Sequence, residues 1–226
     1  MNFREIIEKL SSANRSFSAT VGFDACIDNI VKVIKQKNDA DDIRYYNGIR
    51  EFGEFISSKE NKSCGLDLRT QVSKPGGNMT IASNALGCLG IKTTCIGTFG
   101  TPDVLPIFKS VSPNCELVTV GETVVTTALE FDDGKIMMCD LKPYENLNWQ
   151  GLKDKVGLDS LIHFFQNKQL ISFLNWSEID QSTSIWQGFI DEILPVFQPQ
   201  NDKPIFFCDL SDCSPPGPKD EIYQCP

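Results

Sequence analysis

Histidine is almost absent from this sequence, and so are several short motifs that mark common enzymes. His163 is the only histidine among 226 residues. A Ser/His/Asp or Cys/His triad would therefore depend on this one residue, which lies in the helix-like stretch LDSLIHFFQNK. The phosphate-binding patterns GxxxxGK[ST] and GxGxxG do not occur. These absences disfavour triad hydrolases and the familiar nucleotide-binding loops.

Positive charge and long apolar runs are also scarce. The chain has 21 Lys and Arg against 30 Asp and Glu, which gives a formal net charge of −9. Such a surface repels phosphate backbones and anionic lipids, so we expect no nucleic-acid and no membrane partner. No run of about 18 apolar residues occurs, and the N-terminal stretch MNFREIIEKL has no signal-peptide core. We expect a cytoplasmic protein.

The cysteines lack the spacing of a disulfide framework or a zinc site. Their number, nine, is odd, and no CxxC pair occurs. Cys208 and Cys213 are five residues apart, and His163 is the only histidine that could join them. The pattern indicates free thiols in a reducing compartment, and we expect no metal site.

Strand-like and helix-like segments alternate along the chain. Helical spacing of apolar residues predicts helices over segments 2–10, 47–58, 79–90, 149–166 and 182–197. A composition rich in β-branched and aromatic residues predicts strands over 17–34, 66–72, 92–100, 115–120, 169–176 and 204–210. The first of these strand segments has a break near Asp24. This alternation predicts an α/β domain with a mostly parallel central sheet. Segment 123–141 departs from it, because two β-rich runs flank Asp132-Asp133-Gly134. It predicts a hairpin in a smaller β layer.

The stretch KPGGNMTIASNALGCLG places two glycines and an asparagine before a helix of small residues. Gly76 and Gly77 can adopt backbone conformations closed to other residues and let a ligand approach the main chain. Asn78 offers both a donor and an acceptor, which suits a ligand rich in hydroxyls. The alternative is a tight turn in which Asn78 only caps the helix.

From these residues onward the sequence resembles the ribokinase-like (PfkB) carbohydrate kinases. PGGNMTIASNALGCLGIKTTCIGTFG is similar to their N-terminal signature, with its glycine pair, small-residue helix, Leu-Gly, strand, and final glycines at Gly97 and Gly100. VGFDACIDNIV resembles their first strand, TALEFDDGKIMMCD their β lid, and FFCDLSDCS a strand that ends in aspartate at the middle of their sheet. The resemblance extends from about Ala19 to Asp212.

The resemblance implies a three-layer sandwich with a mostly parallel central sheet and a small β lid, lacking the C-terminal part of the family's fold. On this basis residues 1–212 form an incomplete sugar kinase domain, with lid strands near 27–34, 66–73 and 117–140. Residues 213–226 form an irregular tail. Because the family's lid often dimerises, the resemblance is also compatible with a homodimer through the lid.

The resemblance also implies a sugar site. Asp28 matches the sugar-binding aspartate, since a carboxylate can accept hydrogen bonds from two hydroxyls, and Asp24 is its competitor. Residues 76–78 match the sugar-contacting loop. Ile81 stands where the family commonly has asparagine.

Three further polar residues follow strands near the predicted site. Asn175 could reach the same cleft, or could serve as an N-cap or turn residue. Asp209 and Asp212 end the strand 204–210 and could approach the phosphoryl-transfer region, or could be solvated turn residues. We expect none of them to be the family's catalytic aspartate.

The family's catalytic stretch, which resembles Gly-Ala-Gly-Asp, does not occur in the sequence. The resemblance therefore implies the sugar-binding part of a kinase that transfers the γ-phosphoryl group of ATP, with Mg²⁺, to a hydroxyl of a small-molecule sugar. We expect this chain alone to bind ATP poorly and to be inactive. Alternatives are a non-catalytic sugar-binding or structural derivative, an adenosine-like nucleoside kinase, and an unrelated α/β nucleotide binder.

Overall fold

The computed structural model describes residues 17–39, 42–197 and 203–212. The helix expected over 2–10 and the tail 213–226 lie outside these residues. A first sheet contains five parallel strands in the order β10-β9-β1-β5-β6. Their bounds are β1 Ser18–Phe23, β5 Lys92–Gly97, β6 Cys115–Thr119, β9 Leu170–Phe173 and β10 Ile205–Cys208. The predicted parallel central sheet is confirmed.

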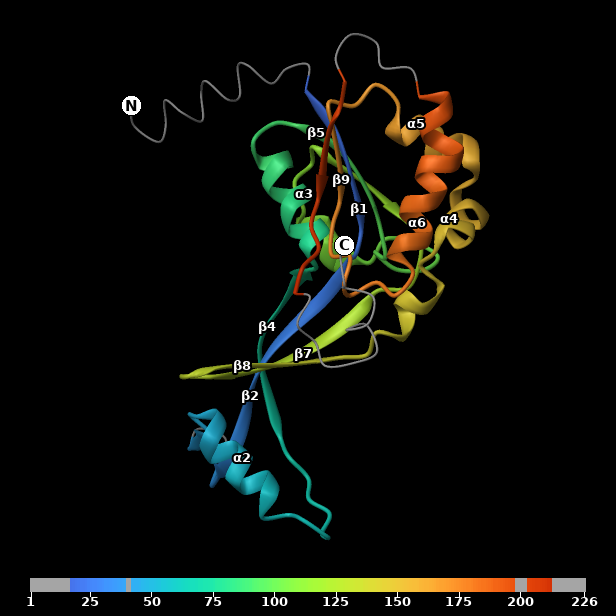
Figure 1. Ribbon diagram of the computed structural model, residues 1–226. Coiled ribbons are helices and arrows are strands. Elements are labelled where there is room, and N and C mark those ends of the chain that lie inside the picture. The colour runs from blue at the N-terminus through green and yellow to red at the C-terminus, as the bar shows by residue number, and fades with distance from the viewer. Residues whose placement is uncertain (1–16, 40–41, 198–202, 213–226) are drawn as a thin grey trace.

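Helices cover both faces of this main sheet (Figure 1). α3 (Asn78–Cys88) lies on one face, and α4 (Trp149–Val156), α5 (Leu158–Phe165) and α6 (Ser182–Gly188) lie on the other. Side chains alternate between the two cores, as they must in a strand. Val21 packs with Met79 of α3, whereas Ile171 packs with Leu161 and Ile185 of the opposite helices. Both faces are therefore dry, which explains the apolar strands.

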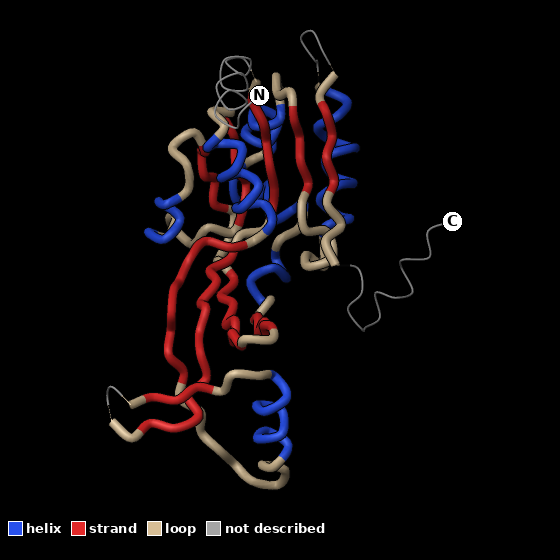
Figure 2. Tube along the Cα trace, turned by 90° about the vertical axis from the view of Figure 1, so that its left-hand side faces the viewer, coloured by secondary structure: helices blue, strands red, loops and turns tan. Residues whose placement is uncertain are grey.

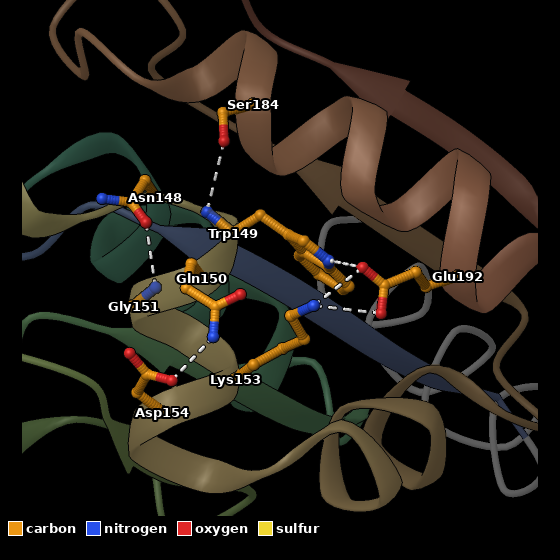
Figure 3. A network of polar contacts seen from close by, with 8 residues as sticks. All are labelled: Asn148, Trp149, Gln150, Gly151, Lys153, Asp154, Ser184 and Glu192. Atoms are coloured by element: carbon orange, nitrogen blue, oxygen red, sulfur yellow. Dashed lines mark hydrogen bonds and ion pairs between the residues drawn. The ribbon is translucent and has the colours of Figure 1, made fainter.

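The continuous helix predicted over 149–166 is wrong, because the chain breaks into α4 and α5 at Gly157. Gly157 has φ 80° and ψ 151°, a conformation that favours glycine and cannot continue a helix. A polar network then holds α4 against the π-helical turn Phe189–Ile193 that continues α6 (Figure 3). Trp149 Nε1 donates to Glu192 Oε1 over 2.6 Å, and Lys153 Nζ lies 2.9 Å from the same oxygen.

A second sheet, the lid sheet, extends away from the main sheet (Figures 1 and 2). Its order is β3-β2-β7-β8, with β4 paired to β2. The strands are β2 Cys26–Lys37, β3 Ile43–Tyr45, β4 Leu68–Gly76, β7 Val124–Phe131 and β8 Gly134–Cys139. The predicted hairpin is present as β7 and β8, which are antiparallel, while β6 pairs with β5 in the main sheet.

The lid sheet has a small core of its own at its far end, where α2 (Ile49–Ser57) packs (Figure 1). Phe52 of α2 contacts the ring of Tyr46 at 5.4 Å and that of Phe131 at 5.5 Å between centroids. Val33 of β2 is fully buried in the same cluster. This packing holds the outer half of the long strands β2 and β7, so their inner half can present side chains toward the main sheet.

Candidate acceptor site

A cleft of about 300 Å³ lies where the carboxyl edge of the main sheet meets the lid sheet. Ligands bind at this edge in open α/β folds. The side chains that line the cleft come from both sheets, from the start of α3 and from the loops after β9 and β10: Asp24, Cys26, Asp28, Gly77, Asn78, Ile81, Val124, Thr126, Met137, Cys139, Leu141, Tyr144, Asn175, Glu178 and Ser211.

Asp28 lies directly against the bare main chain of Gly76. In the antiparallel pair of β2 and β4, Cys26 is opposite Gly76 and Asp28 is opposite Lys74. A Cβ atom at Gly76 would lie 2.5 Å from Asp28 Oδ2, far inside contact distance. The glycine therefore makes room for this carboxylate, which is half-buried and faces the cleft.

Asp24 is fully buried, and its carboxylate is hydrogen-bonded to other groups of the protein. Its carboxylate accepts hydrogen bonds from Met79 N at 2.9 Å and from Asn175 Nδ2 at 3.1 Å. Burial raises the pKa of Asp24 to about 6, and these hydrogen bonds limit the rise. Gly77, with φ 91°, passes so close that a Cβ there would lie 2.6 Å from Asp24 Oδ2. Asp24 thus joins β1, α3 and the loop after β9.

Asn78, Asn175 and Asp209 come from three separate elements and meet at the edge of the cleft. Asn78 Nδ2 donates to Asp209 Oδ2 at 2.8 Å and lies 3.5 Å from Asn175 Oδ1. Asp209 Oδ1 accepts from Ser211 N at 2.9 Å. The structure therefore brings together side chains that are up to 131 residues apart in sequence.

Two residues of the cleft that are not glycine have positive φ angles, Asn175 (61°) and Ser211 (59°). Such conformations cost energy and gather at ligand-binding sites. Asn175 does not cap α6, whose N-cap position is Gln181; it is a turn residue whose side chain holds Asp24. Ser211 lines the cleft. The next residue, Asp212, is exposed and is not part of the cleft lining.

The sequence did not reveal the residues that fix the passage from β1 to the lid. Thr98 Oγ1 donates to Ala25 O at 2.8 Å and accepts from Ala25 N at 3.1 Å. Tyr144 Oη donates to the same carbonyl at 3.2 Å, and burial raises the pKa of this phenol. These partners are 73 and 119 residues from Ala25, so no local pattern could have indicated them.

The pairing register of the lid strands determines which side chains form the floor of the cleft. Asp28 of β2 pairs with Thr126 of β7, which pairs with Cys139 of β8, so the three side chains share one face. Cys26 lies on the same face, and burial together with the nearby Asp28 carboxylate raises the pKa of its thiol. The alternation of the hairpin could have indicated this row, but the pairing of β2 with β7 could not be read from the sequence.

A larger cavity, of about 440 Å³, has Thr98, Glu122 and Lys155 in its lining. We place the candidate site in the smaller cleft because the carboxylates, amides and bare main chain converge there.

Within residues 17–39, 42–197 and 203–212, no group of three or more His, Cys, Asp or Glu is placed to hold a metal ion. In the same part of the chain, no helix is long and apolar enough to cross a bilayer.

Comparisons with known proteins agree with this architecture. Residues 3–212 match the sequence model of the family described as prokaryotic ketohexokinase. Ketohexokinase from Haloferax volcanii is 25% identical over 176 residues, which are 77% of this chain and 47% of that protein. Fructokinase with bound ATP from Xylella fastidiosa is 10% identical with a TM-score of 0.50, over 87% of this chain and 52% of that chain.

A carbohydrate kinase from Agrobacterium tumefaciens is 15% identical, with a TM-score of 0.49, over 77% of this chain and 50% of that chain. The chain thus spans about half the length of the relatives that it matches. The predicted ribokinase-like α/β fold and the resemblance to carbohydrate kinases are confirmed. By the match over residues 3–212, the chain belongs to the prokaryotic ketohexokinase family.

Proposed function

We propose that this chain carries the acceptor-binding part of a carbohydrate kinase and holds a ketose in the cleft between the main sheet and the lid sheet. The observation that carries the proposal is the Asp28 carboxylate, seated against Gly76 and open to a cleft of about 300 Å³. The complete family member would transfer the γ-phosphoryl group of ATP to a hydroxyl of the bound sugar.

The chemistry of the cleft suits a ligand rich in hydroxyls. Each hydroxyl both donates and accepts, so it needs acceptors and donors nearby. The Asp28 carboxylate is an acceptor that can bind two hydroxyls, and charged acceptors form the stronger hydrogen bonds. At the opposite wall, Asn78 Nδ2 donates to Asp209 Oδ2 at 2.8 Å, and the Oδ1 atom of the same amide offers a second acceptor. Asp24 and Asn175 hold the start of α3 in place by bonding to Met79 N and to each other.

The names of the relatives, ketohexokinase and fructokinase, favour a ketose acceptor. ATP and Mg²⁺ are the family's co-substrate and cofactor, but the described residues do not fit them well. They provide no cluster of three metal ligands, and the sequence has no stretch like the Gly-Ala-Gly-Asp that the resemblance implies for the family's catalytic site. We therefore assign no ATP or Mg²⁺ contact to this chain and expect it to bind sugar without turning over ATP.

The test is calorimetric titration of the chain with D-fructose, before and after Asp28→Asn. The change removes the charge and keeps the shape, so fructose affinity should fall about ten- to hundredfold, as expected for the loss of charged hydrogen bonds. Asp159→Asn is the matched control, because Asp159 is an exposed residue of α5. Equal affinity of the Asp28→Asn variant and the unaltered chain would contradict the proposal.

A further inference from the structure

The cleft has two chemically unlike sides. Asp28 and Asn78 supply polar atoms, whereas Ile81 and Met137 supply apolar surface that is open to water. Ile81 is 59% exposed and Met137 is 53% exposed. Single exposed apolar residues are common on protein surfaces. Together with Leu141, which is 39% exposed, these two line the same cleft as the charged and amide groups.

Each wall of the cleft pairs one polar residue with one apolar residue. On α3, Ile81 lies one turn after Asn78, so the two side chains are neighbours on the helix surface. On the lid sheet, Asp28 belongs to the row that contains Thr126 and Cys139. The next row on the same face is Ile30, Ala128 and Met137.

We propose that Ile81 and Met137 determine which acceptor is bound, by receiving the hydroxyl-poor face of a ketohexose whose hydroxyls are held by Asp28 and Asn78. This inference rests on the proposed function. An epimer that turns a hydroxyl toward Ile81 or Met137 loses the water bound to that hydroxyl and gains no partner. Apolar surfaces reject such a hydroxyl by up to about a hundredfold. The side chain of Ile81 carries no hydrogen-bonding atom that could bind this hydroxyl.

Strand alternation provides a matched control for Met137. Met138 is the next residue of β8 and is 57% exposed, but its side chain points to the opposite face of the lid sheet. The two methionines thus share a strand, a residue type and a degree of exposure, and only Met137 lines the cleft. For Ile81 the control is Ile56, which is 44% exposed on α2 at the far end of the lid sheet.

The experiment is calorimetric titration with four D-ketohexoses: D-fructose, its C3 epimer D-psicose, its C4 epimer D-tagatose, and D-sorbose, which differs from D-fructose at both carbons. The unaltered chain should bind its preferred ketohexose at least tenfold more tightly than the weakest one. Met137→Gln and Ile81→Asn should reduce this ratio to about threefold or less, since each adds a partner for the misplaced hydroxyl. Met138→Gln and Ile56→Asn should keep the original ratio. Circular dichroism checks that all four variants are folded.

The outcomes separate this inference from the proposed function. An unchanged epimer ratio in both Met137→Gln and Ile81→Asn would overturn the inference and leave the acceptor site standing. Equal binding of all four sugars by the unaltered chain would also overturn the inference and leave the acceptor site standing. Binding of none of them by the folded, unaltered chain would contradict the proposed function, and the inference with it.

Discussion

Gly76 and Gly77 are neighbours, yet alanine should act differently at each. At Gly76 the added Cβ would lie 2.5 Å from Asp28 Oδ2 and 2.6 Å from Asp28 Cγ. The carboxylate must move by roughly 1 Å to restore ordinary contact, and it can do so because it is the half-buried end of a side chain. Such overpacking costs about 1 kcal/mol. Displacing the carboxylate should weaken D-fructose binding about tenfold or more.

At Gly77 the obstacles cannot move. The φ angle of 91° costs a residue with a side chain about 1–2 kcal/mol. The added Cβ would lie 2.6 Å from Asp24 Oδ2 and 3.1 Å from Ala25 Cα. Asp24 is buried and held by two hydrogen bonds, so overpacking adds about 1–3 kcal/mol. In a chain of this size, the total of about 2–5 kcal/mol should lower the Tm by about 5–15 °C.

Thermal melts and calorimetric titration with D-fructose distinguish the two effects. Gly76→Ala should melt within about 4 °C of the unaltered chain and bind sugar poorly, whereas Gly77→Ala should melt early. Gly53→Ala on α2 is the control, because a Cβ there would meet no atom within 4 Å. Normal fructose affinity in Gly76→Ala, or a normal Tm in Gly77→Ala, would refute the steric reasoning for that position.

Two further predictions concern the supports of the site. Burial raises the pKa of Asp24 from 3.8 to about 6, so the folded chain holds this proton more tightly than the unfolded chain and loses stability as the pH rises from about 4 to 6. Asparagine cannot ionise, so the Asp24→Asn variant should not lose this stability. The free energy of unfolding of the variant minus that of the unaltered chain, measured by denaturant titration, should therefore increase by up to about 3 kcal/mol between pH 4 and 6. A difference that stays constant with pH would contradict the raised pKa of Asp24. Tyr144→Phe removes only the donor to Ala25 O, so it should lower the stability by about 1 kcal/mol in a thermal melt and raise the Kd for D-fructose. No change in either quantity would show that this hydrogen bond does not position the cleft.

The features that could be predicted from the sequence are those that depend on residues close together along the chain. The hairpin turn at Asp132-Asp133-Gly134 and the break at Asp24 between β1 and β2 depend on residues within a few positions of each other, and both are confirmed. Apolar residues recur at helical spacing across Gly157, so the sequence predicted one helix over 149–166. The φ angle of 80° at Gly157 shows that this residue separates two helices instead.

The site was only partly predictable, because its geometry depends on burial and on distant partners. The sequence marked both Asp24 and Asp28 but could not divide their roles. The structure separates them, since Asp24 is fully buried and held by Met79 N and Asn175 Nδ2, whereas Asp28 is half-buried beside Gly76. The bonds from Thr98 and Tyr144 to Ala25 span 73 and 119 residues, so only the folded chain reveals them.

We propose that the Asp28 carboxylate and the main chain at residues 76–78 together bind a sugar, and a crystal of the chain soaked with D-fructose is the decisive test. We expect sugar in the cleft, with a hydroxyl oxygen at about 2.5–3.0 Å from an Asp28 carboxylate oxygen and the ring against Gly76 and Gly77. Fructose bound elsewhere, or in the cleft without contact to Asp28, would contradict it.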